Sequence, residues 1–208
     1  MTTASPVIHV VDDDTSMRTS LARLLSGAGY AVALYATAEE FLQAAGPALT
    51  GCILLDLRLP GASGLDVQRR LAERGCPTPI VFLTAHGDLT TGIRAMKGGA
   101  ADFLEKPAAA DELFAAIATA VAREADTRRQ REELAQLRAR VESLSDRERE
   151  VWLHVARGQL NKQIAYDLGI VERTVKLHRA RAMEKLGAQS TADLVRIAER
   201  LGLPGGPD

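Results

Sequence analysis

The chain has few cysteines, few aromatic residues and no long apolar segment. Its two cysteines, Cys52 and Cys76, lack the spacing of metal ligands, which favours reduced thiols. An aromatic content of 4% argues against a carbohydrate binder or another protein that stacks its ligand on aromatic rings. No apolar run approaches the ~20 residues of a membrane span, and the N-terminus lacks a basic segment followed by an apolar one. We therefore expect a cytoplasmic protein that does not interact with membranes.

The length and the charge distribution predict two small domains. The chain has 208 residues, of which 46% are apolar and 25% charged. This composition is ordinary for a globular protein, but a single domain usually has roughly 100 to 150 residues. Up to residue 122 there are 9 Lys or Arg against 13 Asp or Glu, whereas the remainder has 17 against 14. Such asymmetry is typical of an acidic site joined to a module that binds a polyanion.

Apolar runs alternate with amphipathic segments over the first 120 residues. The apolar runs predict strands at residues 7–11, 31–35, 52–55, 80–83 and 102–104. Helical patterns fall between and after them, near residues 15–27, 38–46, 64–74, 88–98 and from 111 onward. Strands and helices that alternate in this way predict an α/β domain with a five-stranded, parallel, doubly wound sheet.

A long helix is expected to follow the sheet domain. Residues 111–143 contain no Gly or Pro and consist of strong helix formers, which would extend over roughly 50 Å. Beyond a charged middle part, a 3-4-3 spacing of apolar residues involves Leu134, Leu137, Val141 and Leu144. We favour a solvated linker helix over a dimeric coiled coil, because a stable coiled coil usually needs more heptads.

Capping residues and glycines divide the C-terminal part into four helices. Ser145 and Glu148 have the pattern of a capping box at the start of the first helix. Asn161 is the expected cap of the second helix, and Ser190 or Thr191 that of the fourth. The all-α unit would then have helices at about residues 145–157, 161–168, 172–186 and 190–201.

Charged and hydroxyl side chains stand at the ends of four predicted strands. Asp12 and Asp13 follow the first strand, and Asp56 follows the third. Thr84 follows the fourth strand and Lys106 the fifth. The carboxyl ends of parallel strands form the edge at which ligands bind, so these residues should meet. The second strand carries no such residue, which fits an edge position in the strand order 2-1-3-4-5.

The residue types at this edge are suited to phosphoryl transfer. Three carboxylates repel one another unless a hard cation lies between them, since Lys106 offsets only one charge. Mg²⁺ prefers a few carboxylates together with water and phosphate oxygens. The Asp56 carboxylate is a reasonable nucleophile toward phosphorus, and Thr84 and Lys106 could bind the new phosphoryl oxygens. Each residue alone is more often a turn or cap residue, but their joint placement favours a site with Mg²⁺ as cofactor.

Four motifs span the first domain: VVDDD at 10–14, LLDLRLPGASGLD at 54–66, VFLTAHGD at 81–88 and MKGGAADFLEKP at 96–107. With them the domain resembles the flavodoxin-like receiver domain of response regulators of the FixJ/NarL type. The resemblance implies that Asp56 is the phosphoacceptor and that Asp13, Asp56 and the backbone carbonyl of Arg58 bind Mg²⁺. It further implies that Asp12 assists through the coordination shell and that the peptide bond before Pro107 is cis.

The resemblance also assigns roles around the acceptor. Phe103 stands where the family has a Tyr or Phe that turns inward when Thr84 moves toward the phosphate, although a plain core aromatic is an equal alternative. Arg58 and His86 lie two residues beyond the acceptor and the threonine, where the family tunes the lifetime of the acyl phosphate. Ala108 replaces an aromatic residue that often follows Lys-Pro, so packing there is expected to differ.

The third C-terminal helix has an excess of positive charge. Between residues 173 and 185 the only acidic residue is Glu184, against Arg173, Lys176, Arg179, Arg181 and Lys185. A solvated helix usually mixes both signs, so the bias favours contact with DNA phosphates.

Residues 144–190, with KQIAYDLGIVERTVKLHR at their centre, resemble the LuxR-type helix-turn-helix. The resemblance implies that base edges are read by Lys176, Leu177 and Ala180. It implies contacts to the DNA backbone from Lys162, Arg173, Thr174, His178 and Arg179. His178 could instead be a structural side chain. Val171 stands where the family often has a Ser cap.

Together these features predict a two-component response regulator that acts as a transcription factor. A sensor histidine kinase would phosphorylate Asp56, and the chain would dimerise through a surface around residues 88–121 and bind double-stranded promoter DNA, with RNA polymerase as a further partner. The expected domains are a receiver at residues 1–122, a linker helix at 123–143 and a DNA-binding domain at 144–208. Slow autodephosphorylation is expected, but not enzymatic turnover. The alternatives are a phosphohydrolase that uses Asp56, and a constitutive DNA-binding protein with a vestigial pocket.

Overall fold

The computed structural model describes residues 6–46, 48–85 and 89–203. The chain divides into two compact units, Met1–Arg128 and Arg129–Asp208. Each unit has its own apolar core, and the two are described in turn. Among the described residues, no helix is both long enough and apolar enough to cross a membrane.

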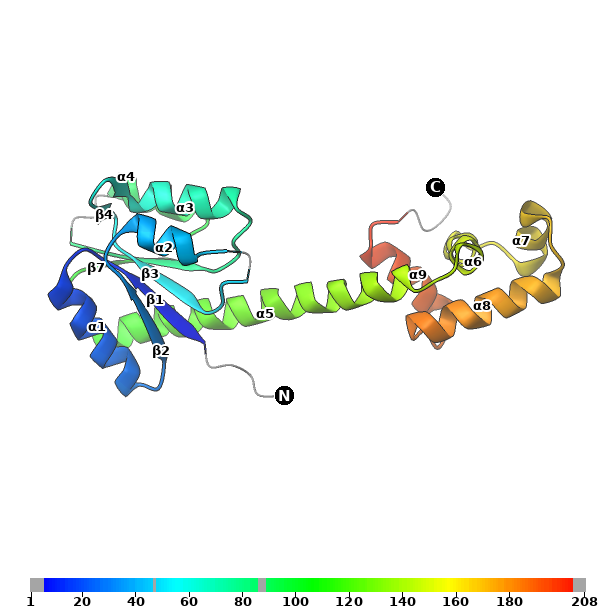
Figure 1. The fold of residues 1–208 in the computed structure, drawn as a ribbon, viewed down its shortest axis with the longest axis horizontal. Helices are drawn as coiled ribbons and strands as arrows, with labels where there is room; N and C mark the ends of the chain where they lie inside the picture. The colour runs from blue at the N-terminus through cyan, green and yellow to red at the C-terminus, as the bar shows by residue number, and fades with distance from the viewer. Residues whose placement is uncertain (1–5, 47, 86–88, 204–208) are drawn as a thin grey trace. The chain divides into compact units, whose positions relative to one another are not determined.

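The N-terminal unit contains the predicted parallel sheet. Its strands are β1 (Val7–Val11), β2 (Ala31–Tyr35), β3 (Cys52–Leu55), β6 (Ile80–Thr84) and β7 (Asp102–Glu105). Their order in the sheet is β2-β1-β3-β6-β7, which confirms the predicted order of the five strands (Figure 1). A short antiparallel pair that the sequence did not predict lies just after the acidic end of β3; it consists of β4 (Arg58–Leu59) and β5 (Ala62–Ser63).

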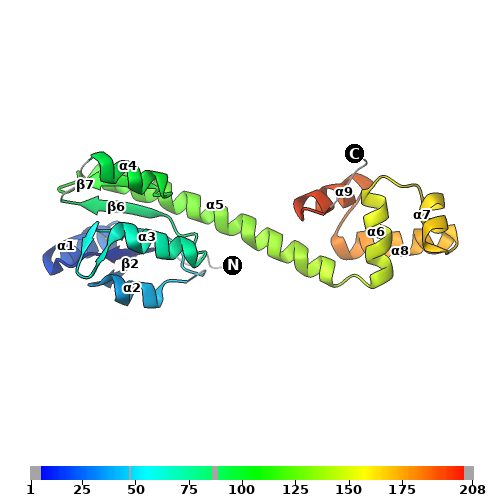
Figure 2. The same cartoon turned by 90° about the horizontal axis from the view of Figure 1, so that it is seen from above.

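Helices cover both faces of this sheet and give it two cores. They are α1 (Thr15–Gly27), α2 (Ala38–Ala44), α3 (Gly64–Glu73), α4 (Leu89–Lys97) and the first part of α5 (Ala110–Glu142). Successive residues of a strand point to opposite faces. Ile53 and Leu55 of β3 therefore pack with α2, α3 and α4, whereas Cys52 and Leu54 pack with α1 and α5. Figure 2 shows α3 and α5 on opposite faces of β6. A sheet covered on both faces explains why β3 and β6 are buried at every position and are almost entirely apolar.

The helix α5 is one continuous element of 33 residues, close to the predicted span. In the N-terminal unit it buries Leu113, Ile117 and Ala120 against the sheet. Its last part belongs to the C-terminal unit, where Leu137 is 8% exposed and Val141 is 4% exposed. The interpretation of a solvated linker is therefore wrong for these two residues. Val141 packs in the core that the chain's own C-terminal helices form, and Leu137, one turn earlier on the same apolar stripe, is buried as well.

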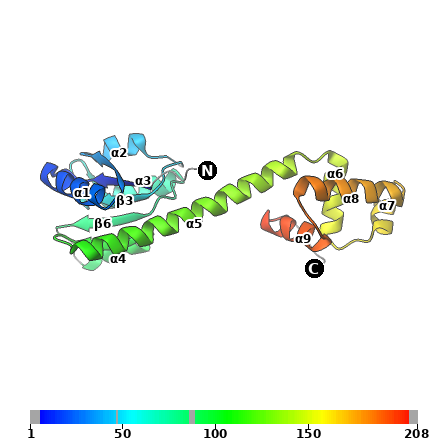
Figure 3. The ribbon, with the colours of Figure 1, turned by 90° about the horizontal axis from the view of Figure 1, so that it is seen from below.

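The C-terminal unit completes its core with four helices, as predicted. They are α6 (Asp146–Ala156), α7 (Asn161–Leu168), α8 (Glu172–Leu186) and α9 (Thr191–Arg200), shown in Figure 3. Trp152 is fully buried at the centre, and its indole N–H donates to the carbonyl oxygen of Leu194 at 3.0 Å. This bond satisfies the one polar group of a large apolar side chain and fixes α6 against α9.

Three helix starts were assigned from the sequence, and two of them are confirmed. Ser145 caps α6 with Glu148, and Ser190 caps α9 with Asp193. The assignment of Asn161 as the cap of α7 is wrong, because the preceding Leu160 occupies that position. The side chain of Gln163 accepts the Leu160 N–H at 2.8 Å and so replaces the side-chain cap that the sequence suggested.

Candidate functional site

The acidic residues meet at the carboxyl edge of the sheet because of strand register. Val11 of β1 lies opposite Leu55 of β3, so the residues that follow them leave the sheet side by side. The backbone N–H of Asp56 donates to the Val11 carbonyl oxygen at 2.9 Å. Asp12, Asp13 and Asp56 bring carboxylate oxygens within 4.8 Å of one another. The strand order thus places together residues more than forty positions apart in the sequence.

Lys106 lies between two of these carboxylates. Its Nζ is 2.6 Å from Oδ2 of Asp12 and 2.6 Å from Oδ2 of Asp56. The Lys106 side chain is 10% exposed, and burial alone would lower its pKa. The hydrogen bonds and charges of the two aspartates outweigh burial and raise the pKa of Lys106 above its ordinary value. Lys106 is therefore a fixed cation at this edge.

The three carboxylates have different surroundings. Asp12 is buried and accepts the Asp14 N–H at 2.9 Å, whereas Asp13 is exposed. The Asp56 side chain is 11% exposed, and its Oδ1 accepts the backbone N–H of Arg58 at 3.1 Å. Three carboxylates therefore face one ammonium group, an excess of negative charge that a hard cation could offset. The donor set fits Mg²⁺, which prefers oxygen ligands and keeps part of its water shell.

The backbone around Asp56 tolerates no larger residue at Gly64. Its N–H donates to the Leu57 carbonyl oxygen at 2.8 Å. A Cβ atom there would lie 2.5 Å from the carbonyl oxygen of Asp56 and 2.9 Å from the Phe82 ring. Gly64 is not among the site residues predicted from the sequence, although the GASGLD motif indicates a tight turn followed by a helix cap.

The predicted switch residues lie on the two strands that follow β3 in the sheet, Thr84 on β6 and Phe103 on β7. Thr84 ends β6 and is 1% exposed, and its carbonyl oxygen accepts the Lys106 N–H at 2.8 Å. Phe103 is partly buried, with its ring 6.2 Å from that of Phe82 and close to Gly92 of α4. The Lys106–Pro107 peptide bond is cis. Arg58 is exposed, and His86 lies outside the described residues.

The basic helix α8 presents part of its predicted contact set to solvent. The exposed members are Lys176, Leu177 and Ala180 of the group expected at base edges, together with Arg173 of α8 and Lys162 of α7. Lys176 lies 3.3 Å from Glu172 one turn earlier. Such an exposed pair is weak and leaves the lysine available to another anion.

The other predicted contact residues of α8 are only partly exposed. They are Thr174, His178 and Arg179. Arg179 donates to the side chains of Asn161 at 3.3 Å and of Thr191, so it joins three helices. The Nδ1 atom of His178 is buried and has no hydrogen-bond partner among the described residues.

One basic residue of α8 has a structural role. Lys185 donates to Glu148 at 2.6 Å and to the Ser143 carbonyl oxygen at 3.0 Å. It therefore ties α8 to the start of α6. The positive charge that α8 offers to a ligand is smaller than the residue count of the sequence suggested.

Comparisons with known proteins find a matching family for each of the two units. Residues 8–118 match the response regulator receiver domain family, and residues 142–198 match the luxR family of bacterial regulatory proteins. The chain belongs to the response regulators. Its first unit is a receiver domain and its second a LuxR-type helix-turn-helix domain.

Similar response regulators extend over nearly the whole chain. Nodulation protein W of Bradyrhizobium diazoefficiens is 46% identical over 197 residues, which cover 95% of this chain and 87% of that protein. The transcriptional regulatory protein FixJ of Azorhizobium caulinodans is 43% identical, with coverage of 94% and 93%. Among solved structures, the response regulator StyR has a TM-score of 0.87 at 44% identity, covering 95% of this chain and all of that one. These matches place the chain in the two-component, DNA-binding class of regulators.

Proposed function

We propose that Asp56 of this response regulator accepts a phosphoryl group from a sensor histidine kinase. The observation that carries the proposal is the position of the Asp56 carboxylate, which is 2.6 Å from Lys106 and within 4.8 Å of two further carboxylates. A carboxylate oxygen of Asp56 forms a bond to phosphorus as the bond from phosphorus to the kinase histidine nitrogen breaks. The products are an acyl phosphate on Asp56 and a free imidazole on the kinase.

The chain's own residues prepare this transfer. Lys106 balances the charge of the new phosphoryl oxygens, and its two carboxylate contacts keep it protonated and in place. Asp13, Asp56 and the backbone carbonyl of Arg58 would hold Mg²⁺, and Asp12 would act through its coordination shell. Bound Mg²⁺ would supply positive charge to the phosphoryl oxygens. Water would later hydrolyse the acyl phosphate slowly, at a rate set by Arg58 and His86.

Thr84 and Phe103 are the proposed link from the acceptor to a dimer surface. A move of Thr84 toward the phosphate frees space beside β6, and Phe103 turns into it. The face formed by residues 88–121 carries exposed apolar side chains, among them Ile93 at 45% and Met96 at 46% exposure. Burial of such side chains would stabilise a homodimer, and a dimer binds paired DNA half-sites.

The proposed DNA contacts divide into two groups. Lys176, Leu177 and Ala180 read base edges, and Lys162 and Arg173 contact phosphates, which agrees with their exposure. Thr174, His178 and Arg179 complete the phosphate contacts. Arg179 has intramolecular partners, so its contribution to DNA affinity is expected to be smaller.

The remaining assignments are proposals of the same kind. We assign the receiver to residues 1–122, the linker to 123–143 and the DNA-binding domain to 144–208, although the burial of Leu137 and Val141 favours an earlier start for the last domain. RNA polymerase is a further proposed partner, and the cytoplasm is the proposed location.

The deciding experiment is a titration of promoter DNA in acetyl phosphate and Mg²⁺. The wild-type chain should bind DNA about tenfold or more tightly after phosphorylation, and Asp56→Asn should not respond, because an amide cannot form the acyl phosphate. Glu39→Gln, at an exposed position of α2 outside the proposed dimer surface, is the control and should behave as wild type. Equal DNA affinity of the wild type and Asp56→Asn would contradict the switch. Sustained phosphate release from small phosphoesters would instead indicate a phosphohydrolase.

A further inference from the structure

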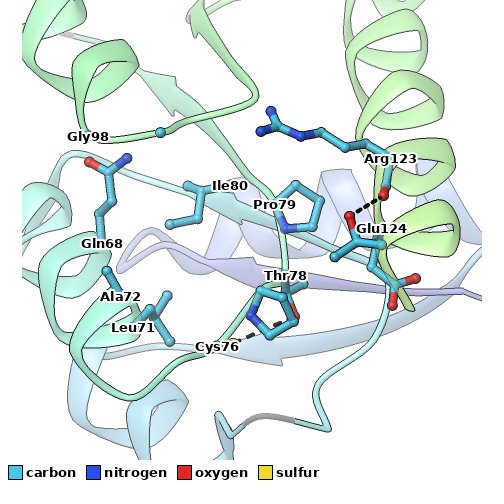
Figure 4. Close-up of a pocket in the computed structure, with 13 residues that line it drawn as sticks. Gln68, Leu71, Ala72, Cys76, Thr78, Pro79, Ile80, Gly98, Arg123 and Glu124 are labelled. Atoms are coloured by element: carbon cyan, nitrogen blue, oxygen red, sulfur yellow. Dashed lines mark hydrogen bonds between the residues drawn. The ribbon is translucent and has the colours of Figure 1, made fainter. Parts of the chain in front are cut away.

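A cavity of about 230 Å³ lies at the edge of the receiver opposite Asp56. It is formed by α3, the segment before β6, the turn before β7 and the part of α5 near residue 124 (Figure 4). Its wall combines polar groups with five apolar side chains: Leu71, Ala72, Pro77, Pro79 and Ile80. No step of the proposed phosphoryl transfer uses these residues.

Three buried polar residues line this cavity: Gln68, Thr78 and Glu124. The Thr78 hydroxyl already donates to the Leu49 carbonyl oxygen at 2.6 Å. Glu124 of α5 has a side chain that is 5% exposed, and its only ion pair among the described residues is with Arg128 at 3.9 Å. That separation is too long for a hydrogen bond. A carboxylate withdrawn from water without a close cation is costly, so Glu124 is a strong acceptor for a cationic donor.

Gln68 of α3 provides a second acceptor. The residue is 7% exposed, and its Nε2 donates to the Ala95 carbonyl oxygen at 3.0 Å, which fixes the orientation of the amide. Its Oε1 lies beside Gly98, where a Cβ atom would be 2.6 Å away. The Gln68 amide therefore packs directly against the backbone at Gly98, where no side chain displaces it, and its acceptor oxygen is held in place. Ligand sites typically combine an apolar wall with a few fixed polar groups, as this cavity does.

We propose that this cavity binds a small organic cation that carries an amidinium or guanidinium group on a flat apolar body. The planar cation donates to the Glu124 carboxylate, with Gln68 Oε1 as a further acceptor for an N–H group. The apolar body packs against Leu71, Pro79 and Ile80. Arg123 lines the same cavity and disfavours an occupant with a second positive charge. The site does not depend on phosphorylation of Asp56.

A titration of the full chain with benzamidine, followed by backbone-amide NMR, tests the proposal. Saturable shifts are expected for Gly98, Gly99 and residues 123–127. Benzoate, which has the same apolar body and the opposite charge, should produce no such shifts. Glu124→Gln, of nearly the same shape, should weaken binding of benzamidine about tenfold or more, because the charge-assisted bond is lost. Glu112→Gln, at an exposed position of α5, is the matched control and should bind as wild type.

A second variant keeps the test valid if Glu124→Gln fails to fold. Ala72 is exposed and lines the cavity, so Ala72→Leu should block it without changing any charge. Loss of benzamidine binding in this variant, with an unchanged circular dichroism spectrum, would support the site. The proposal would be overturned by an absence of saturable shifts in the wild type, by equal binding of benzoate, or by unchanged binding in both cavity variants.

Discussion

At the scale of single residues, Lys106 determines the electrostatics of the carboxylate cluster. One ammonium group contacts two carboxylates at 2.6 Å each, and all three side chains are nearly buried. Removal of one partner from such a buried group leaves charge without compensation. Lys106 therefore stabilises the unphosphorylated receiver as well as serving the proposed transfer.

Lys106→Met should lower the free energy of unfolding of the receiver by about 3 kcal/mol in the absence of Mg²⁺. Added Mg²⁺ should restore part of this loss, because a ligand that binds only the folded state stabilises it. Urea unfolding followed by circular dichroism, with and without Mg²⁺, measures both effects. Lys97→Met, at an exposed position of α4, is the control and should change little. A Lys106→Met variant that is as stable as wild type without Mg²⁺ would refute this account.

The residues that meet at the candidate site could be predicted because each follows a recognisable strand. Asp12 and Asp56 stand directly after apolar runs, and Lys106 stands two residues after Leu104. The rule that ligands bind at the carboxyl ends of parallel strands brings the three together. The sequence could not show that Lys106 contacts two carboxylates at once. Nor could it show that Gly64 lies against the Asp56 carbonyl, since this contact depends on how closely α3 approaches β3.

At the scale of elements, helix starts are held by side chains that the sequence only partly reveals. Glu148 is 4% exposed and accepts from both the Ser145 N–H and the Lys185 ammonium group. The capping box was predictable from four consecutive residues, but the lysine comes from a helix 37 positions later. The prediction that Asn161 caps α7 was wrong, because Leu160 is the cap residue and the side chain of Gln163 accepts the Leu160 N–H.

The Glu148 contacts predict the acid stability of the C-terminal unit. The hydrogen bond from Lys185, followed by that from the Ser145 N–H, lowers the pKa of Glu148 below its ordinary value of 4.5. A carboxyl group with a lowered pKa stabilises the fold above its unfolded pKa, and this stability is lost as the pH falls through the folded pKa. The C-terminal unit should therefore become less stable below about pH 4.5.

Trp152 is the only tryptophan of the chain and reports on this unit alone. Urea unfolding followed by Trp152 fluorescence measures the free energy of unfolding of this unit. Glu148→Gln should lower this free energy at pH 7, and the free energy should then fall less steeply with decreasing pH than in the wild type. Glu184→Gln, an exposed residue of α8, should keep the wild-type pH dependence. If Glu148→Gln loses stability between pH 5 and pH 3 as steeply as wild type, another group controls the acid transition.

At the scale of the whole molecule, α5 contributes to two separate cores. Leu113 and Ile117 belong to the core of the receiver, and Leu137 and Val141 are buried in the C-terminal unit. The sequence predicted one helix and showed its second apolar stripe, but periodicity cannot identify what covers a stripe. The same periodicity is compatible with a stripe that faces solvent, a partner helix or the chain's own helices. Only the tertiary packing decides among the three.

The division of the chain at residue 128 predicts the behaviour of fragments. A fragment of residues 129–208 should fold cooperatively, whereas residues 144–208 should be less stable because the stripe of α5 is missing. In the fragment of residues 129–208, Leu137→Ala should lower the free energy of unfolding by about 2 to 3 kcal/mol, as large-to-small changes in a core do. Urea unfolding followed by Trp152 fluorescence gives these values, with Gln136→Ala at an exposed position as control. Equal stability of the two fragments would contradict the assignment of the stripe to this core.

The position of that stripe also constrains how such genes can recombine. A chimera that joins a foreign receiver at residue 143 would keep the four C-terminal helices but remove Leu137 and Val141 from beneath them. A junction near residue 128 would transfer the second half of α5 together with the helices that it stabilises. The exchangeable module therefore begins inside a helix, and a crossover in the loop before α6 would damage the part that it was meant to preserve.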